Sequence, residues 1–73
     1  MLGEELRKAR LAAELTQEKL SFEADLDRTY ISQLENDKKS PTVDALLRIC
    51  DALGTSASKI LANVEAKRRR RSK

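Results

Sequence analysis

Four polar side chains lie within one short segment, and together they could form hydrogen bonds with the edges of nucleic-acid bases. They are Arg28, Thr29, Ser32 and Gln33. A guanidinium group can bind O6 and N7 of guanine as a fork, a glutamine amide can pair with N6 and N7 of adenine, and threonine can offer its methyl group to thymine. At helical spacing the four share one face. The same pattern also suits a solvated helix face, so the surrounding elements must decide between the two interpretations.

A helix that enters a groove of DNA must be held across a second helix, and the neighbouring residues predict such a pair. Thr16 can cap a helix that ends at Ala24, because its hydroxyl can accept a hydrogen bond from a free N–H group of the first turn. Asp27 is the candidate cap of a helix over residues 28–35. The residues expected at the crossing are Ala24, Leu26 and Ile31. This is the helix-turn-helix arrangement, whose second helix enters the major groove.

Apolar residues at three- and four-residue steps predict three more helices, and no alternating pattern favours a strand. The first spans about residues 2–14, with Leu2, Leu6, Ala9 and Ala13 inward. The fourth lies between Thr42 and Gly54, with Val43, Leu46, Leu47, Cys50 and Leu53 inward. The fifth starts at Ser56, carries Ile60, Leu61 and Val64, and can continue into the arginine run. The expected fold class is all-α, a bundle of five helices in which the second and third form the helix-turn-helix.

Composition excludes several kinds of chemistry. The chain has 73 residues, enough for one compact domain, with a single cysteine and no histidine. Disulfides, the usual zinc sites and histidine-based catalysis are therefore not expected, and Cys50 is interpreted as a small core residue. No apolar run is long enough for a membrane span or a signal peptide. We expect a cytoplasmic protein that is not an enzyme and uses no cofactor, metal, membrane or small-molecule ligand.

The positive net charge comes from one end of the chain. Residues 67–73 hold six of the 15 basic residues, so residues 1–66 carry nine basic and 12 acidic groups, a net charge of −3. We therefore divide the chain into a domain over residues 1–66 and a basic C-terminal tail over residues 67–73. The tail could add sequence-independent affinity for DNA or RNA through its charge, or it could serve solubility or contact with an acidic protein.

Several short sequences make the chain similar to the Cro and phage-repressor type of helix-turn-helix proteins, the XRE family. They are Leu15-Thr16-Gln17, Tyr30-Ile31-Ser32, Gln33-Leu34-Glu35-Asn36, Pro41 and Ala52-Leu53-Gly54. The similarity extends over about residues 3–62. It implies a repressor-like bundle and a transcription regulator that reads a double-stranded DNA operator in the major groove through its third helix.

The resemblance also implies roles for individual residues. Those expected to contact bases are Arg28, Thr29, Ser32 and Gln33. Those expected to contact phosphates are Gln17, Tyr30, Asn36, Lys38 and Lys39. Arg10 and Glu35 are expected to form a structural salt bridge between the first and third helices, and Gln17 is expected to brace the third helix.

Three positions differ from the family pattern. Asp25 and Asp37 stand where the family usually has glycine, and Ser21 stands where it usually has alanine. Aspartate tolerates left-handed backbone conformations better than most residues, so both turns should form. We expect their negative charges to weaken DNA affinity, and we expect the Ser21 hydroxyl to need a carbonyl one turn back.

A dimer would suit a chain of this size, and the resemblance places its interface on the fifth helix. The candidates are Ile60, Leu61 and Val64, which could equally belong to the core. Two recognition helices about 34 Å apart would read two related half-sites. The run Arg28-Thr29-Tyr30 resembles controller proteins of restriction-modification systems, although phage repressors and antitoxins have the same size. A protein-interaction module that kept the fold but lost DNA binding, such as an antitoxin-like partner, is the alternative.

Overall fold

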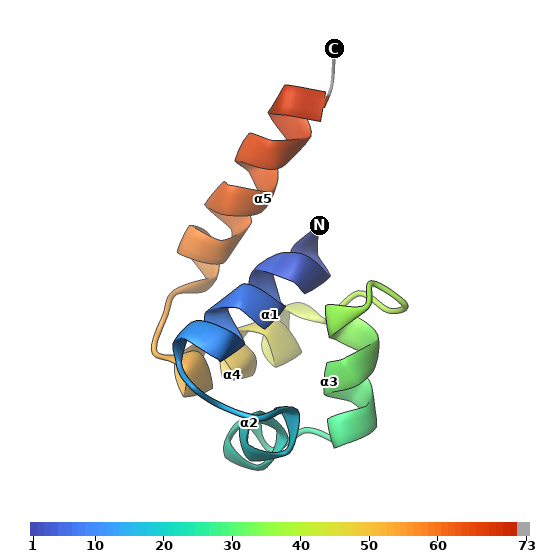
Figure 1. Ribbon diagram of the computed structural model, residues 1–73, viewed down its shortest axis with the longest axis vertical. Coiled ribbons are helices and arrows are strands. Elements are labelled where there is room, and N and C mark those ends of the chain that lie inside the picture. The colour runs from blue at the N-terminus through green and yellow to red at the C-terminus, as the bar shows by residue number, and fades with distance from the viewer. Residues whose placement is uncertain (72–73) are drawn as a thin grey trace.

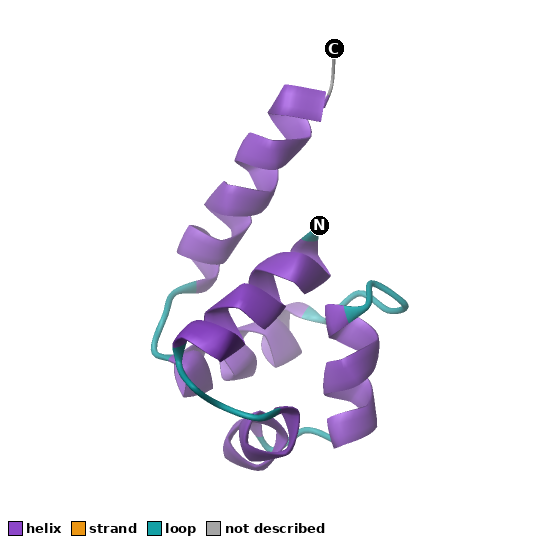
Figure 2. Cartoon of the chain, in the orientation of Figure 1, coloured by secondary structure: helices purple, strands orange, loops and turns teal. Residues whose placement is uncertain are grey.

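The computed structural model describes the backbone of residues 1–71 and the side chains of residues 1–70. The helices are α1 (Leu2–Ala12), α2 (Gln17–Ala24), α3 (Arg28–Glu35), α4 (Val43–Leu53) and α5 (Ala57–Arg71). No strand occurs in this part of the chain, and the loops between helices are short (Figure 2). The predicted all-α class with five helices is confirmed.

Side-chain caps and left-handed residues set most helix boundaries. The hydroxyl of Thr16 accepts from the N–H of Lys19 at 3.0 Å and begins α2, while Thr42 accepts from Ala45 at 3.1 Å and begins α4. Gly54 ends α4 with a φ of 73°, which suits a residue without a side chain. The two caps and this helix end are as predicted.

The first helix is shorter than predicted. It ends at Ala12 instead of residue 14, because Glu14 adopts a left-handed φ of 59° and the N–H of Leu15 returns to the carbonyl of Arg10 at 3.1 Å. The prediction that Ala13 faces inward was wrong, since Ala13 lies beyond the helix and is exposed.

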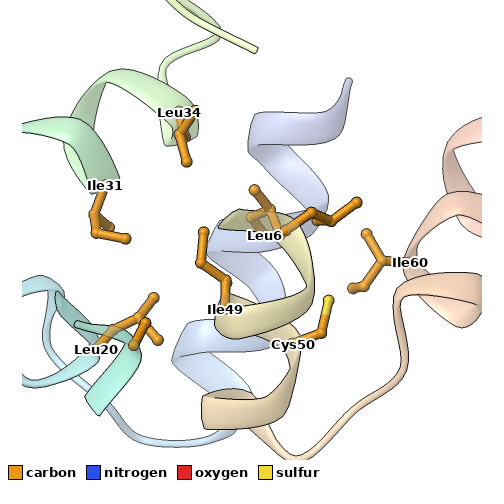
Figure 3. Close-up of a cluster of buried hydrophobic side chains, with 9 residues drawn as sticks. Leu6, Leu20, Ile31, Leu34, Ile49, Cys50 and Ile60 are labelled. Atoms are coloured by element: carbon orange, nitrogen blue, oxygen red, sulfur yellow. The ribbon is translucent and has the colours of Figure 1, made fainter. Parts of the chain in front are cut away.

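A single core draws buried side chains from all five helices. Leu6 of α1, Leu20 of α2, Ile31 and Leu34 of α3, Ile49 and Cys50 of α4 and Ile60 of α5 surround one interior (Figure 3). Cys50 is 1% exposed and packs as a small apolar residue, as predicted. The core packs against the face of α3 that carries Ile31 and Leu34, and the opposite face stays accessible to solvent.

The inward face of α4 differs from the prediction. Leu46 and Cys50 are buried as expected, but Val43 is 75% exposed and Leu47 is 49% exposed. Ala45 and Ile49 are buried in their place. The buried positions follow one helical stripe, and residues 43 and 47 lie outside it. These two predictions were wrong because several apolar residues in this helix exceed what one stripe can bury.

The first turn of α1 comes close to the backbone of the last turn of α3. A Cβ atom on Gly3 would lie 2.5 Å from the carbonyl oxygens of both Leu34 and Glu35. The two helices can approach this closely only because residue 3 has no side chain.

The last helix leaves the body of the molecule and carries much of the predicted tail. It follows Ser56, whose hydroxyl accepts from the N–H of Lys59 at 3.1 Å, and it extends past the N-terminus of α1 (Figure 1). Lys67 binds α1, with its Nζ atom 2.6 Å from Glu5 Oε2 and 3.3 Å from Glu4 Oε1. Residues 72 and 73 of the tail lie outside the described residues. None of the described helices is long and apolar enough to cross a membrane.

Candidate nucleic-acid interface

The turn between α2 and α3 consists of three residues. Asp25 takes a left-handed conformation, with φ 57° and ψ 48°, and its N–H bonds to the carbonyl of Phe22 at 3.3 Å. The N–H of Leu26 bonds to the carbonyl of Ser21 at 2.9 Å. Aspartate therefore forms the turn that the family usually forms with glycine. The crossing residues are placed as predicted, since Ala24 and Ile31 are buried and Leu26 is half-buried.

Ser21 lies buried on α2 and its hydroxyl is satisfied locally. Its Oγ atom donates to the carbonyl of Glu18 at 2.7 Å. The expected partner one turn back is confirmed, so the serine costs no unpaired buried polar group.

The two faces of α3 have opposite properties. Ile31, Leu34 and Glu35 are buried, whereas Arg28 and Thr29 are exposed. Ser32, Gln33 and Tyr30 are half-buried. Asp27 holds the cap position with an extended backbone, but its carboxylate makes no capping bond to α3. The first turn of α3 therefore presents two unobstructed polar side chains while the core holds the rest of the helix.

A network of charged and polar groups joins three helices behind this face. Arg10 Nε lies 2.6 Å from Glu35 Oε2, and Arg10 Nη2 lies 3.0 Å from Glu35 Oε1. Gln17 Nε2 donates to the same Oε1 atom at 3.1 Å, and Arg10 Nη1 donates to the carbonyl of Leu15 at 2.8 Å. The two charged side chains are only 10% and 4% exposed. Loss of either partner of such a buried pair costs about 3–5 kcal/mol.

The loop after α3 carries the remaining candidates. Asn36 donates from Nδ2 to the carbonyl of Ser32 at 2.9 Å, and Lys38 and Lys39 are exposed. Asp37 is left-handed with φ 57°, and its carboxylate points to the first turn of α1. The amino group of Met1 and the N–H of Gly3 lower the pKa of Asp37. The base and phosphate candidates therefore occupy α3, the start of α2 and the loop that follows α3.

The three candidates on α5 fall into different environments. Ile60 is 4% exposed and belongs to the core, Leu61 is 41% exposed, and Val64 is half-buried. Leu61 is therefore the most accessible apolar side chain of the three.

One contact beside the candidate site escaped the sequence analysis. Gly3 and the carboxylate of Asp37 meet across 34 residues of chain, and no local pattern predicts that contact. The only feature of the sequence that could have pointed to this contact is the aspartate at position 37, where the family usually has glycine.

The bundle, its short turn and the polar outer face of α3 define a small all-helical protein of the DNA-binding class. A helix-turn-helix family model matches residues 6–60. Control protein C.BamHI of Bacillus amyloliquefaciens is 39% identical over 62 residues, which cover 84% of this chain and 76% of that protein.

Two solved structures have the same fold. The restriction-modification controller protein C.AhdI from Aeromonas hydrophila has a TM-score of 0.79 and 30% identity, over 81% of this chain and 89% of that chain. The clp gene regulator ClgR from Corynebacterium glutamicum has a TM-score of 0.86 and 29% identity, over 90% of this chain and 70% of that chain. The chain belongs to the XRE-type helix-turn-helix family, and it is a DNA-binding transcription regulator. The resemblance inferred from its sequence is confirmed.

Proposed function

We propose that this protein binds an operator of two related half-sites as a homodimer, with α3 of each protomer in the major groove. The observation that carries the proposal is the division of α3, whose first turn exposes Arg28 and Thr29 while Ile31 and Leu34 are buried. Arg28, Thr29 and Gln33 read base edges in this proposal, and Ser32 assists. Base contacts of this kind supply sequence specificity, which phosphate contacts do not.

Phosphate contacts flank α3 on both sides in the proposed complex. Gln17 and Tyr30 act at one side, and Asn36, Lys38 and Lys39 act at the other. Gln17 already donates its side-chain N–H to Glu35. Its side-chain amide carries a second hydrogen that can be donated to phosphate, and its backbone N–H lies at the start of α2, where free N–H groups and the helix dipole favour an anion.

The proposed biological role is control of a restriction-modification system. Its support is the similarity to C.BamHI and C.AhdI, whose names describe control proteins, over more than four fifths of this chain. The protein would act in the cytoplasm, as a binding protein and not an enzyme, and without a cofactor or small-molecule ligand.

Support for a homodimer comes from α5. Leu61 is a large apolar side chain that is 41% exposed, and Val64 lies one turn from Ile60 on the same helix. A second copy would bury Leu61 and place the two α3 helices about one turn of DNA apart.

Binding to the DNA upstream of the protein's own gene tests the proposal. Fluorescence anisotropy would compare this duplex with a scrambled duplex of equal length, using wild type, Arg28→Ala and the exposed α5 variant Lys59→Ala as a control that also removes one positive charge. We expect wild type and Lys59→Ala to prefer the upstream duplex and Arg28→Ala to lose that preference. Equal binding of wild type to both duplexes would refute the proposal and favour a protein-interaction module of the same fold.

A further inference from the structure

Asp37 lies where the loop after α3 meets the first turn of α1. Its own N–H bonds to the carbonyl of Leu34 at 3.1 Å, and the N–H of Lys38 bonds to the carbonyl of Gln33 at 2.8 Å. With a φ of 57°, Asp37 therefore terminates α3 and directs the chain toward Lys38 and Lys39.

The carboxylate of the same residue closes the start of another helix. Asp37 Oδ1 accepts from the N–H of Gly3 at 2.9 Å, and Oδ2 lies 3.0 Å from the amino group of Met1. Met1 occupies the cap position of α1 and provides no capping side chain. The N–H groups of a first helical turn lack partners within the helix, and a negative charge there is favoured by the helix dipole. Asp37 thus supplies the cap that α1 lacks.

Close backbone packing fixes the position of the first turn of α1 relative to Asp37. Gly3 lies against the carbonyl oxygens of Leu34 and Glu35, so the first turn of α1 and the last turn of α3 are in direct contact. The carboxylate of Asp37 spans the remaining gap. Movement of the loop relative to α1 would break the bond to Gly3.

We propose that Asp37 is a positioning residue that clamps the loop carrying Lys38 and Lys39 to α1, and thereby orients both lysines for phosphate contact beside α3. The inference rests on the proposed DNA binding. It also reverses the expectation from sequence, in which the negative charge of Asp37 only weakens the affinity for DNA. The two interpretations predict opposite signs for removal of the carboxylate.

Two substitutions at this position separate the interpretations. Asp37→Gly keeps a residue suited to the left-handed backbone but removes the clamp, whereas Asp37→Asn keeps an acceptor for the N–H of Gly3 and removes the charge. We expect Asp37→Gly to weaken operator affinity about tenfold, the effect of one lost charge-assisted contact. The slope of log affinity against log salt should fall by about one to two, since each lost phosphate contact removes about 0.9. Asp37→Asn should lose less of both than Asp37→Gly, because its amide oxygen can still accept from the N–H of Gly3 although the contact with the amino group of Met1 is lost.

Asp25 offers a matched control. It has the same φ of 57°, and within the described part of the chain no donor bonds to its carboxylate. Asp25→Gly therefore removes an equal charge without a clamp, and we expect unchanged or higher affinity with an unchanged salt slope. The clamp is refuted if Asp37→Gly behaves like Asp25→Gly, or if Asp37→Asn loses as much as Asp37→Gly.

Hydrogen exchange at Gly3, measured by NMR on the free protein, tests the clamp without DNA. This N–H belongs to the first turn of α1 and is bonded to Asp37. We expect it to be protected in wild type and Asp37→Asn and to exchange faster in Asp37→Gly. Equal exchange in all three proteins would overturn the clamp even if DNA binds. A protein that protects Gly3 but does not prefer the upstream duplex would instead refute the proposed function.

Discussion

Arg28 and Glu35 stand at the two ends of α3 and illustrate how one helix combines two tasks. Arg28 is exposed at the first turn, whereas Glu35 is buried at the last turn and bonded to Arg10 and Gln17. A substitution at Glu35 would therefore impair DNA binding by releasing the helix, although Glu35 touches no base in the proposed complex. A variant that loses DNA binding therefore identifies a base contact only if the variant is also shown to keep the wild-type fold.

Gly3 is a position where the addition of a single methyl group should lower the stability of the fold. In Gly3→Ala the new methyl group would lie 2.5 Å from two backbone carbonyl oxygens, and neither can turn aside as a flexible side chain would. We expect a loss of about 1–3 kcal/mol in the free energy of unfolding, the usual cost of overpacking. Urea denaturation measures it. Arg7→Ala, at an exposed position of the same helix, should change stability by less than about 0.5 kcal/mol, and equal stabilities of the two variants would contradict the contact.

Among the helices, α2, α3 and α4 could be predicted closely because their boundaries are encoded locally. Thr16 and Thr42 cap the helices that follow them, each by accepting from the N–H three residues on, and Gly54 ends α4. The inward face of α4 was not predictable in full, because Val43 and Leu47 are as apolar as the residues that are buried. Burial there depends on where α2 and α5 pack.

The site shows the same limit. The candidates on α3 share one face because helical periodicity is local, and the structure places Arg28 and Thr29 outward. The junction of Gly3 with Asp37 depends on the packing of α1 against α3, so the sequence provided the residue types but not the contact. The sequence predicted the left-handed turn at Asp37 and a negative charge near DNA, but not the bond from its carboxylate to the start of α1.

The docking of α5 on α1 should depend on pH. The ammonium group of Lys67, whose Nζ atom lies 2.6 Å from Glu5 Oε2, is the largest influence on Glu5 and lowers its pKa below the ordinary value of 4.5. A lowered pKa in the folded state means that the contact stabilises the fold above the ordinary pKa, and that this contribution is lost as the pH falls through the folded pKa. We expect the amides of α5 beyond residue 60 to lose protection from hydrogen exchange on acidification toward pH 3.

Two lysine substitutions on α5 check this expectation. Lys67→Met should remove much of the difference between neutral and acidic pH, because the pair with Glu5 is already absent. Lys59→Met, at an exposed position of the same helix, should retain the wild-type pH dependence. The same acid dependence in Lys67→Met and wild type would show that another group controls the docking.

At the scale of the whole molecule, charge is distributed unevenly. The net charge of residues 1–66 is −3, and the basic residues 67–71 continue α5 beyond the body (Figure 1). Overall charge therefore does not account for attraction of the body to DNA. In the proposed complex, a few cations on α3 and its loop supply local affinity, and the basic residues at the end of α5 add salt-dependent attraction.

The proposed dimer makes a prediction at this scale. Leu61→Glu would place a charge within the interface on α5, and we expect dimerisation to weaken at least about tenfold, because burial of an unpaired charge is costly. Sedimentation equilibrium at micromolar concentration measures it. Lys59→Glu, which introduces the same side chain at an exposed position of α5, should remain as dimeric as wild type. A Leu61→Glu protein that dimerises normally would locate the interface elsewhere.

The most direct measurement is the affinity of wild type and Arg28→Ala for a set of operators that differ at one base pair at a time. If Arg28 reads guanine, wild type should discriminate against substitution at one guanine of each half-site by about 1–3 kcal/mol. Arg28→Ala should lose discrimination at that base pair and keep it at the others. Equal weakening of Arg28→Ala on every operator, with wild-type discrimination retained at each base pair, would contradict base reading by α3 through this residue.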